Sequence, residues 1–115
     1  MRHKHRMLYY WMLVAAGACH AQREYFKEVF GYKCAISKKN LIKARKAGLW
    51  IFWFMDTFVG DENRNEFKEI VNREYHDHTD NIKYDFDAAI ERIIDRFLFL
   101  FENNNNEYYW SENPF

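Results

Sequence analysis

The sequence predicts an all-α fold, organised as a small single-domain bundle of four to five helices. Of its 115 residues, 49% are apolar and 20% are aromatic, which is enough for one hydrophobic core and untypical of a disordered chain. Only four glycines and one proline interrupt the chain, and the alternation of apolar and polar residues that marks strands is hard to find. We therefore expect one helical domain over residues 1–102 and a polar and aromatic C-terminal tail over residues 103–115.

Three helices are expected in the first half of the chain. Residues 7–18 are apolar on nearly every side, which is typical of a helix buried in the core or in an interface. Residues 21–30 place apolar side chains on one face, and Gly31 follows as a helix terminator; the apolar residues are Tyr25, Phe26, Val29 and Phe30. A third helix begins at Ser37, a favourable N-cap residue, and stops at Gly48.

The second half contains one ambiguous segment and two helices. Residues 49–59 fit a buried helix or a strand, because periodicity does not separate the two in so short an apolar run. A helix over about 63–75 would begin with a capping box of Asn63 and Glu66, and a polar connection follows it. The clearest helix runs from about 87 to 102, where a continuous apolar stripe contains Ile90, Ile93, Ile94, Phe97, Leu98 and Phe101. Phe99 and Leu100 lie off this stripe, which predicts burial on a second side or contact with a partner.

The first 19 residues allow two interpretations. A basic head precedes an apolar run that ends at Cys19, and a secretion signal has this order, which would make the protein secreted or lipid-anchored. The run contains Tyr9, Tyr10 and Trp11, however, and it is shorter than the about 20 residues of a transmembrane helix. We expect a cytoplasmic protein that does not bind a membrane.

Charge divides the chain into two opposite halves. Residues 1–55 contain 11 Lys or Arg and 2 Asp or Glu, a net charge of +9, whereas residues 56–115 contain 6 and 15, a net charge of −9. Within the basic half, residues 32–46 read YKCAISKKNLIKARK and contain no acidic residue. Cations clustered at helical spacing can neutralise phosphates and release their counterions, so this segment is the candidate nucleic-acid-binding region.

The same region resembles a helix-turn-helix of the kind found in phage and plasmid replication or regulatory proteins. The resemblance covers about residues 22–48: Phe30-Gly31 would end the positioning helix, and Ile36-Ser37 would open a basic recognition helix. It implies a DNA-binding protein with a helix-turn-helix-like pair, in which the amide of Asn40 suits adenine and the lysines suit phosphates. The predicted nucleic-acid-binding residues are Lys33, Ser37, Lys38, Lys39, Asn40, Lys43, Arg45 and Lys46.

A helical protein–protein interaction module is the alternative function. Aromatic side chains dominate interface hot spots, and the predicted partner-binding residues are Trp50, Trp53, Phe99, Tyr108, Tyr109 and Trp110. Such a module could be a phage structural adaptor or an inhibitor of a host defence protein. The oppositely charged halves could also join copies of the chain into a homo-oligomer. Small size and many Asn and Lys residues favour a phage or mobile-element source.

No residue spacing typical of a catalytic or cofactor site is present. His76 and His78 lie among carboxylates, but the other ligands of a metal-dependent hydrolase are not evident, and a hydrated loop explains these residues. We therefore expect a protein that is not an enzyme, has no cofactor or metal site and takes no small-molecule substrate.

Overall fold

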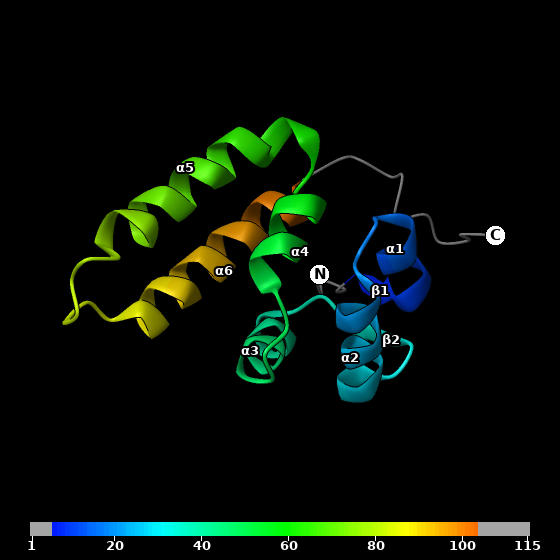
Figure 1. The fold of residues 1–115 in the computed structure, drawn as a ribbon. Helices are drawn as coiled ribbons and strands as arrows, with labels where there is room; N and C mark the ends of the chain where they lie inside the picture. The colour runs from blue at the N-terminus through cyan, green and yellow to red at the C-terminus, as the bar shows by residue number, and fades with distance from the viewer. Residues whose placement is uncertain (1–5, 104–115) are drawn as a thin grey trace. The chain divides into compact units, whose positions relative to one another are not determined.

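The computed structural model describes residues 6–103, and this part of the chain is mostly helical (Figure 1). Its elements, in chain order, are β1 (Met7–Tyr9), α1 (Tyr10–Ala15), α2 (His20–Phe30), β2 (Lys33–Ala35), α3 (Lys38–Lys46), α4 (Ile51–Phe58), α5 (Arg64–Glu74) and α6 (Phe86–Glu102), with short 3-10 turns at Asp61–Asn63 and His76–His78. The described residues form two compact units, residues 6–51 and 52–103, and each is described by itself. The single domain expected over residues 1–102 stays a prediction.

The first unit contains a small sheet that the all-α prediction missed. Strands β1 and β2 pair antiparallel, with Leu8 opposite Cys34. The backbone N–H of Tyr10 donates to the carbonyl of Tyr32 at 2.8 Å, which continues the pairing at one end. The helix predicted over residues 7–18 is therefore wrong at its start: the chain is extended at Met7–Tyr9, and the helix covers only Tyr10–Ala15.

The helices of the first unit bury fewer side chains than expected. Helix α2 begins at His20 and ends before Gly31, close to the predicted bounds. Of its four predicted inward residues, Phe26 is buried, whereas Tyr25 is exposed and the other two are half-buried. The core of this unit consists of Leu8, Met12, Leu13, Phe26, Ile36, Leu41, Ala44 and Ile51.

In the second unit, three helices pack around Phe97. The ambiguous segment is helical, because α4 covers Ile51–Phe58. Helices α5 and α6 contact each other and lie side by side (Figure 1). The ring of Phe97 on α6 lies 5.7 Å from that of Phe54 on α4 and 6.1 Å from that of Phe67 on α5, measured between centroids. Five of the six predicted stripe residues of α6 are buried; Leu98 is only half-buried, and Leu100, predicted off the stripe, is buried instead.

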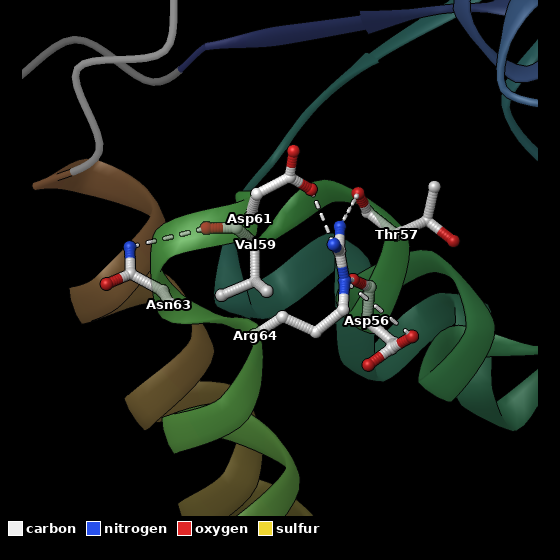
Figure 2. Close-up of polar contacts among 6 residues, drawn as sticks. All are labelled: Asp56, Thr57, Val59, Asp61, Asn63 and Arg64. Carbon is white, nitrogen blue, oxygen red and sulfur yellow. Dashed lines mark hydrogen bonds and ion pairs between the residues drawn. The ribbon is translucent and has the colours of Figure 1, made fainter.

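Arg64 closes the corner between α4 and α5 (Figure 2). Its Nε donates to the carbonyl of Asp56 at 2.8 Å, and its Nη2 donates to that of Thr57 at 3.2 Å. These carbonyls belong to the last turn of α4, where the helix itself supplies no donors. Its Nη1 also pairs with the carboxylate of Asp61. One guanidinium therefore caps α4 and fixes the start of α5.

The capping box predicted for α5 is not formed. The side chain of Asn63 makes no cap hydrogen bond; its Nδ2 donates to the carbonyls of Val59 at 3.4 Å and Leu100 at 3.3 Å. Glu66 instead pairs with Arg96 of α6 at 2.7 Å. Both side chains thus connect helices to one another, which a local motif does not reveal.

Candidate nucleic-acid interface

Helix α3 begins with two hydrogen bonds that use predicted nucleic-acid-binding residues. The Oγ of Ser37 accepts the backbone N–H of Asn40 at 3.2 Å, which is an N-cap, as predicted. The Nδ2 of Asn40 donates to the carbonyl of Ala35, the last residue of β2, at 2.8 Å. These bonds attach the start of α3 to the end of the small sheet. The amide that suits adenine is thus engaged within the protein.

One side of α3 is apolar and lies inward. Leu41 and Ala44 are buried, and Ile42 is half-buried. At the C-terminal end the backbone N–H of Leu49 donates to the carbonyl of Ala44 at 3.0 Å, and Gly48 has a positive φ of 95° that only glycine adopts readily. The helix is therefore fixed along one side and at both ends.

Three exposed lysines form one face of α3, here called the lysine face: Lys39, Lys43 and Lys46. They are spaced i, i+4 and i+7, so they fall within about 60° around the helix and span about 10 Å along it. The Nζ of Lys43 also lies 5.2 Å from the ring centroid of Phe30 on α2, which is a cation–π distance. Within residues 6–103, none of the three forms an ion pair with a carboxylate.

The other predicted cations are placed differently. Lys38 and Arg45 are half-buried and each interacts with another group, so they do not belong to the lysine face. Of the predicted cations on α3, Lys38 and Arg45 are thus not exposed with Lys39, Lys43 and Lys46, because a helix nine residues long must turn part of its surface inward. Lys33 is exposed at the start of β2.

The carboxylates of the first unit are few. Residues 6–51 contain nine Lys or Arg and two Glu, a net charge of +7. Of the two, Glu24 accepts a hydrogen bond from the hydroxyl of Tyr10 at 2.6 Å and pairs with Lys27 at 2.9 Å. The hydrogen bond from Tyr10 lowers the pKa of Glu24, and the contact with Glu24 raises the pKa values of Tyr10 and Lys27. Glu24 thus neutralises a cation of its own helix and leaves the lysine face uncompensated.

The predicted partner-binding aromatics lie in different surroundings. Trp50 is 61% exposed, so its side chain is not part of the core. Trp53 is half-buried, and its ring meets that of Phe58 at 6.5 Å. Phe99 is 54% exposed on α6, with the guanidinium of Arg96 at 4.9 Å from its centroid. The remaining three, Tyr108, Tyr109 and Trp110, lie outside the described residues.

The segment around His76 and His78 packs against its neighbours through ring stacking and hydrogen bonds. The ring of His78 stacks on that of Tyr84 with centroids 3.9 Å apart, and the hydroxyl of Tyr84 donates to the carbonyl of Glu74 at 2.7 Å. Arg92 of α6 pairs with the Glu74 carboxylate at 2.7 Å. No group of three or more His, Cys, Asp or Glu side chains in residues 6–103 is arranged to hold a metal ion. These contacts join the ends of α5 and α6.

Comparison with models of known families, with curated proteins and with solved structures found no match. Within the described residues, no helix is long and apolar enough to span a membrane. Two features of the candidate interface were not predicted from the sequence. They are the strand β2 between α2 and α3 and the hydrogen bond from the Asn40 side chain to the carbonyl of Ala35. The signal for the lysine face itself, an i, i+4, i+7 spacing within a basic segment, is visible in the sequence.

Proposed function

We propose that the protein binds DNA through the lysine face of α3. The observation that carries this proposal is the grouping of Lys39, Lys43 and Lys46 on one exposed face, without a carboxylate partner in the described part of the chain. The unit around them has a net charge of +7, which attracts a polyanion over a longer range than the three contacts alone. A cytoplasmic location follows from this proposal, because that is where a phage-type or plasmid-type regulator meets DNA.

Helix stability does not account for the position of Lys39. Lys39 lies in the first turn of α3, where the helix dipole disfavours a cation. Lys39 and Lys43, four residues apart, repel each other, at a cost of about 0.2–0.5 kcal/mol per such pair. Phosphates placed along the face would remove this repulsion. A polyanionic ligand therefore accounts for Lys39, whereas the helix dipole already favours Lys46 in the last turn.

The residues around the face have separate roles in the proposal. The three lysines, with Lys33 at the start of β2, contact phosphates and set affinity rather than sequence preference. Ser37 and Asn40 position the helix through their hydrogen bonds. The helix-turn-helix resemblance remains part of the proposal in a modified form, with a strand in place of a tight turn between the two helices.

Fluorescence anisotropy with a labelled random-sequence duplex tests the proposal. If the lysine face neutralises three phosphates, it contributes a slope of about −2.7 to the fall of log K with log salt, which is about 40-fold in affinity between 50 and 200 mM salt; a contact from Lys33 would steepen this slope. Replacing Lys39, Lys43 and Lys46 together by Ala should remove most of this binding and flatten the salt dependence.

The matched control removes three exposed cations from the other unit, Lys68, Arg73 and Lys83. It changes the net charge equally and should retain the binding and the slope. Loss of binding in both triple variants would show that only net charge matters. If the wild-type protein bound neither the duplex nor single-stranded DNA at 50 mM salt, the proposal would be refuted.

A protein-binding role is the second candidate, and the exposure of Phe99 favours it. An apolar ring that is 54% exposed on a helix with an otherwise regular buried stripe is a suitable interface anchor. Opposite net charges on the two halves would also support head-to-tail association of copies. Sedimentation at low and high salt tests this role: an oligomer that dissociates in high salt, or on Phe99→Ala substitution, supports it, and a monomer at every concentration contradicts self-association.

A further inference from the structure

Exposed aromatic side chains occur together with the positive charge. Among the described residues, the first unit exposes Tyr25 (37%), Tyr32 (66%) and Trp50 (61%). The ring of Tyr32 is already in contact with Tyr10, edge to face at 5.7 Å, and the Nζ of Lys27 lies 5.6 Å from its centroid. The ring of Trp50, by contrast, has no ring contact within residues 6–103. An indole left exposed in a basic unit has room for a flat ligand on its face.

Two of these aromatics lie at the C-terminal end of α3. A Cβ at Gly48 would lie 3.6 Å from Cε2 of Tyr25, so the tyrosine ring rests against the turn that follows Lys46. The backbone N–H of Trp50 donates to Oε1 of Gln22 at 2.9 Å, and Gln22 is one helical turn before Tyr25 on α2. Trp50 and Tyr25 are therefore held close to the end of the lysine face.

We propose that the nucleic acid bound here is single-stranded, with bases stacked on Trp50 and Tyr25 and phosphates held by the lysine face. This inference rests on the proposed function and specifies its ligand. In a duplex the base faces are hidden in the stack and only their edges are accessible, whereas a single strand offers each base face to an aromatic ring. A positively charged track beside exposed aromatic rings is the arrangement that non-specific single-strand binding requires.

The Trp50 side chain can be changed without disturbing the fold around it. Its hydrogen bond to Gln22 is donated by the backbone nitrogen, so every substitution except proline retains it. Trp50→Ala should weaken binding of an oligo(dT) longer than the about 4–16 nucleotides of a typical site by about 5- to 150-fold, since that is the range for loss of one stacked base. Trp50→Phe retains an aromatic ring and should recover most of the affinity.

Tryptophan fluorescence provides a second readout of stacking. Oligo(dT) should quench the emission of the wild-type protein, because the exposed Trp50 ring would contact a base directly. Trp50→Phe should lose this quenching while still binding, and Trp53→Phe, which replaces a half-buried ring of the other unit, should retain it. Far-UV circular dichroism of each variant verifies that the helices are intact.

The outcomes separate this inference from the proposed function. Tighter binding of oligo(dT) than of a duplex, with a loss on Trp50→Ala that affects oligo(dT) alone, supports it. Equal binding of both ligands, unchanged by Trp50→Ala but abolished by the triple lysine substitution, overturns the single-strand inference and leaves DNA binding in place. Binding of neither ligand at low salt refutes both proposals.

Discussion

Substitution of Lys39 by Glu should make the protein more stable and less able to bind DNA. Lys39 is exposed in the first turn of α3, next to the Ser37 cap, and that turn contains no acidic residue. A carboxylate there interacts favourably with the helix dipole and faces Lys43 one turn later, in the orientation that stabilises helices best. Stability and function are therefore expected to change in opposite directions at one residue.

The magnitude follows from these two contacts. A carboxylate in the first turn contributes about 0.3–1 kcal/mol through the dipole. Changing the Lys39–Lys43 repulsion into an attraction contributes about 0.2–0.5 kcal/mol for the loss of one and a similar amount for the gain of the other. The free energy of unfolding should thus rise by about 1 kcal/mol at low ionic strength.

Urea denaturation followed by far-UV circular dichroism measures this change, and anisotropy with the same samples measures binding. In 1 M salt, where the Debye length is about 3 Å, most of the stability gain should disappear. Lys46→Glu is the matched control. In the last turn the dipole favours a cation, so its loss offsets the new pair with Lys43, and stability should change by less than about 0.5 kcal/mol while binding still falls.

Two results would refute this reasoning. A Lys39→Glu protein that is less stable than wild type at low salt would mean that Lys39 makes a stabilising contact and is not merely tolerated. A variant that binds DNA as tightly as wild type would mean that the lysine face is not the contact surface, whatever the effect on stability.

Three further predictions concern residues with defined contacts. Arg64→Ala should lower the free energy of unfolding, measured by urea denaturation, by about 2 kcal/mol, because two carbonyls of α4 lose a charged donor. Asp61→Ala removes only an exposed ion pair and should lower it by less than about 1 kcal/mol; equal losses in the two variants would contradict this. Asn40→Ala should lower the free energy of unfolding by about 1 kcal/mol, because it removes the hydrogen bond to Ala35, and should leave the salt slope of DNA binding unchanged. A variant that keeps its stability but loses a preference for adenine-containing sites would show that Asn40 contacts DNA and does not position the helix. Burial raises the pKa of the Cys34 thiol from its ordinary 9.0 to about 11, so at pH 8 the thiolate fraction of Cys34 is about 100-fold smaller than that of an ordinary cysteine. Mass spectrometry after alkylation should therefore find the exposed Cys19 modified first, and equal alkylation rates of the two cysteines would refute this. Because the pKa of Cys34 is higher in the folded protein than in the unfolded chain, its neutral thiol favours the folded state. This contribution to the free energy of unfolding is complete below about pH 9 and is lost as the pH rises toward 11.

Local patterns predicted the elements whose causes are local. The Ser37 cap, the Gly48 stop and the apolar stripe of α6 each depend on residues within a few turns, and all three are present. The prediction of Leu98 in place of Leu100 shows the limit of this approach. Leu98 lies at one edge of the apolar stripe. The helices that pack against α6 decide which edge of the stripe is buried, and the sequence of α6 alone does not contain this information.

Features that join distant residues were missed for the same physical reason. Strand β1 exists because Met7–Tyr9 pairs with residues 33–35, and neither segment alternates long enough to reveal a strand. The Asn63 and Glu66 side chains fit a capping box, but partners on α6 compete for both. For the candidate site, composition located the basic segment, whereas the separation of exposed from half-buried cations required the packing of α3.

The contacts that fix α3 at its two ends are separate from the side chains of the lysine face. The helix is fixed at its start by Ser37 and Asn40 and at its end by the Gly48 turn, and none of these contacts uses a lysine side chain. Substitutions of Lys39 and Lys46 should therefore change charge without moving the helix, and substitution of Lys43 also removes its cation–π contact with Phe30. A ligand that binds this face meets cations already arranged along one line, so little ordering of the backbone is required on binding. Loss of binding without loss of helix content would then be attributable to the missing contacts themselves.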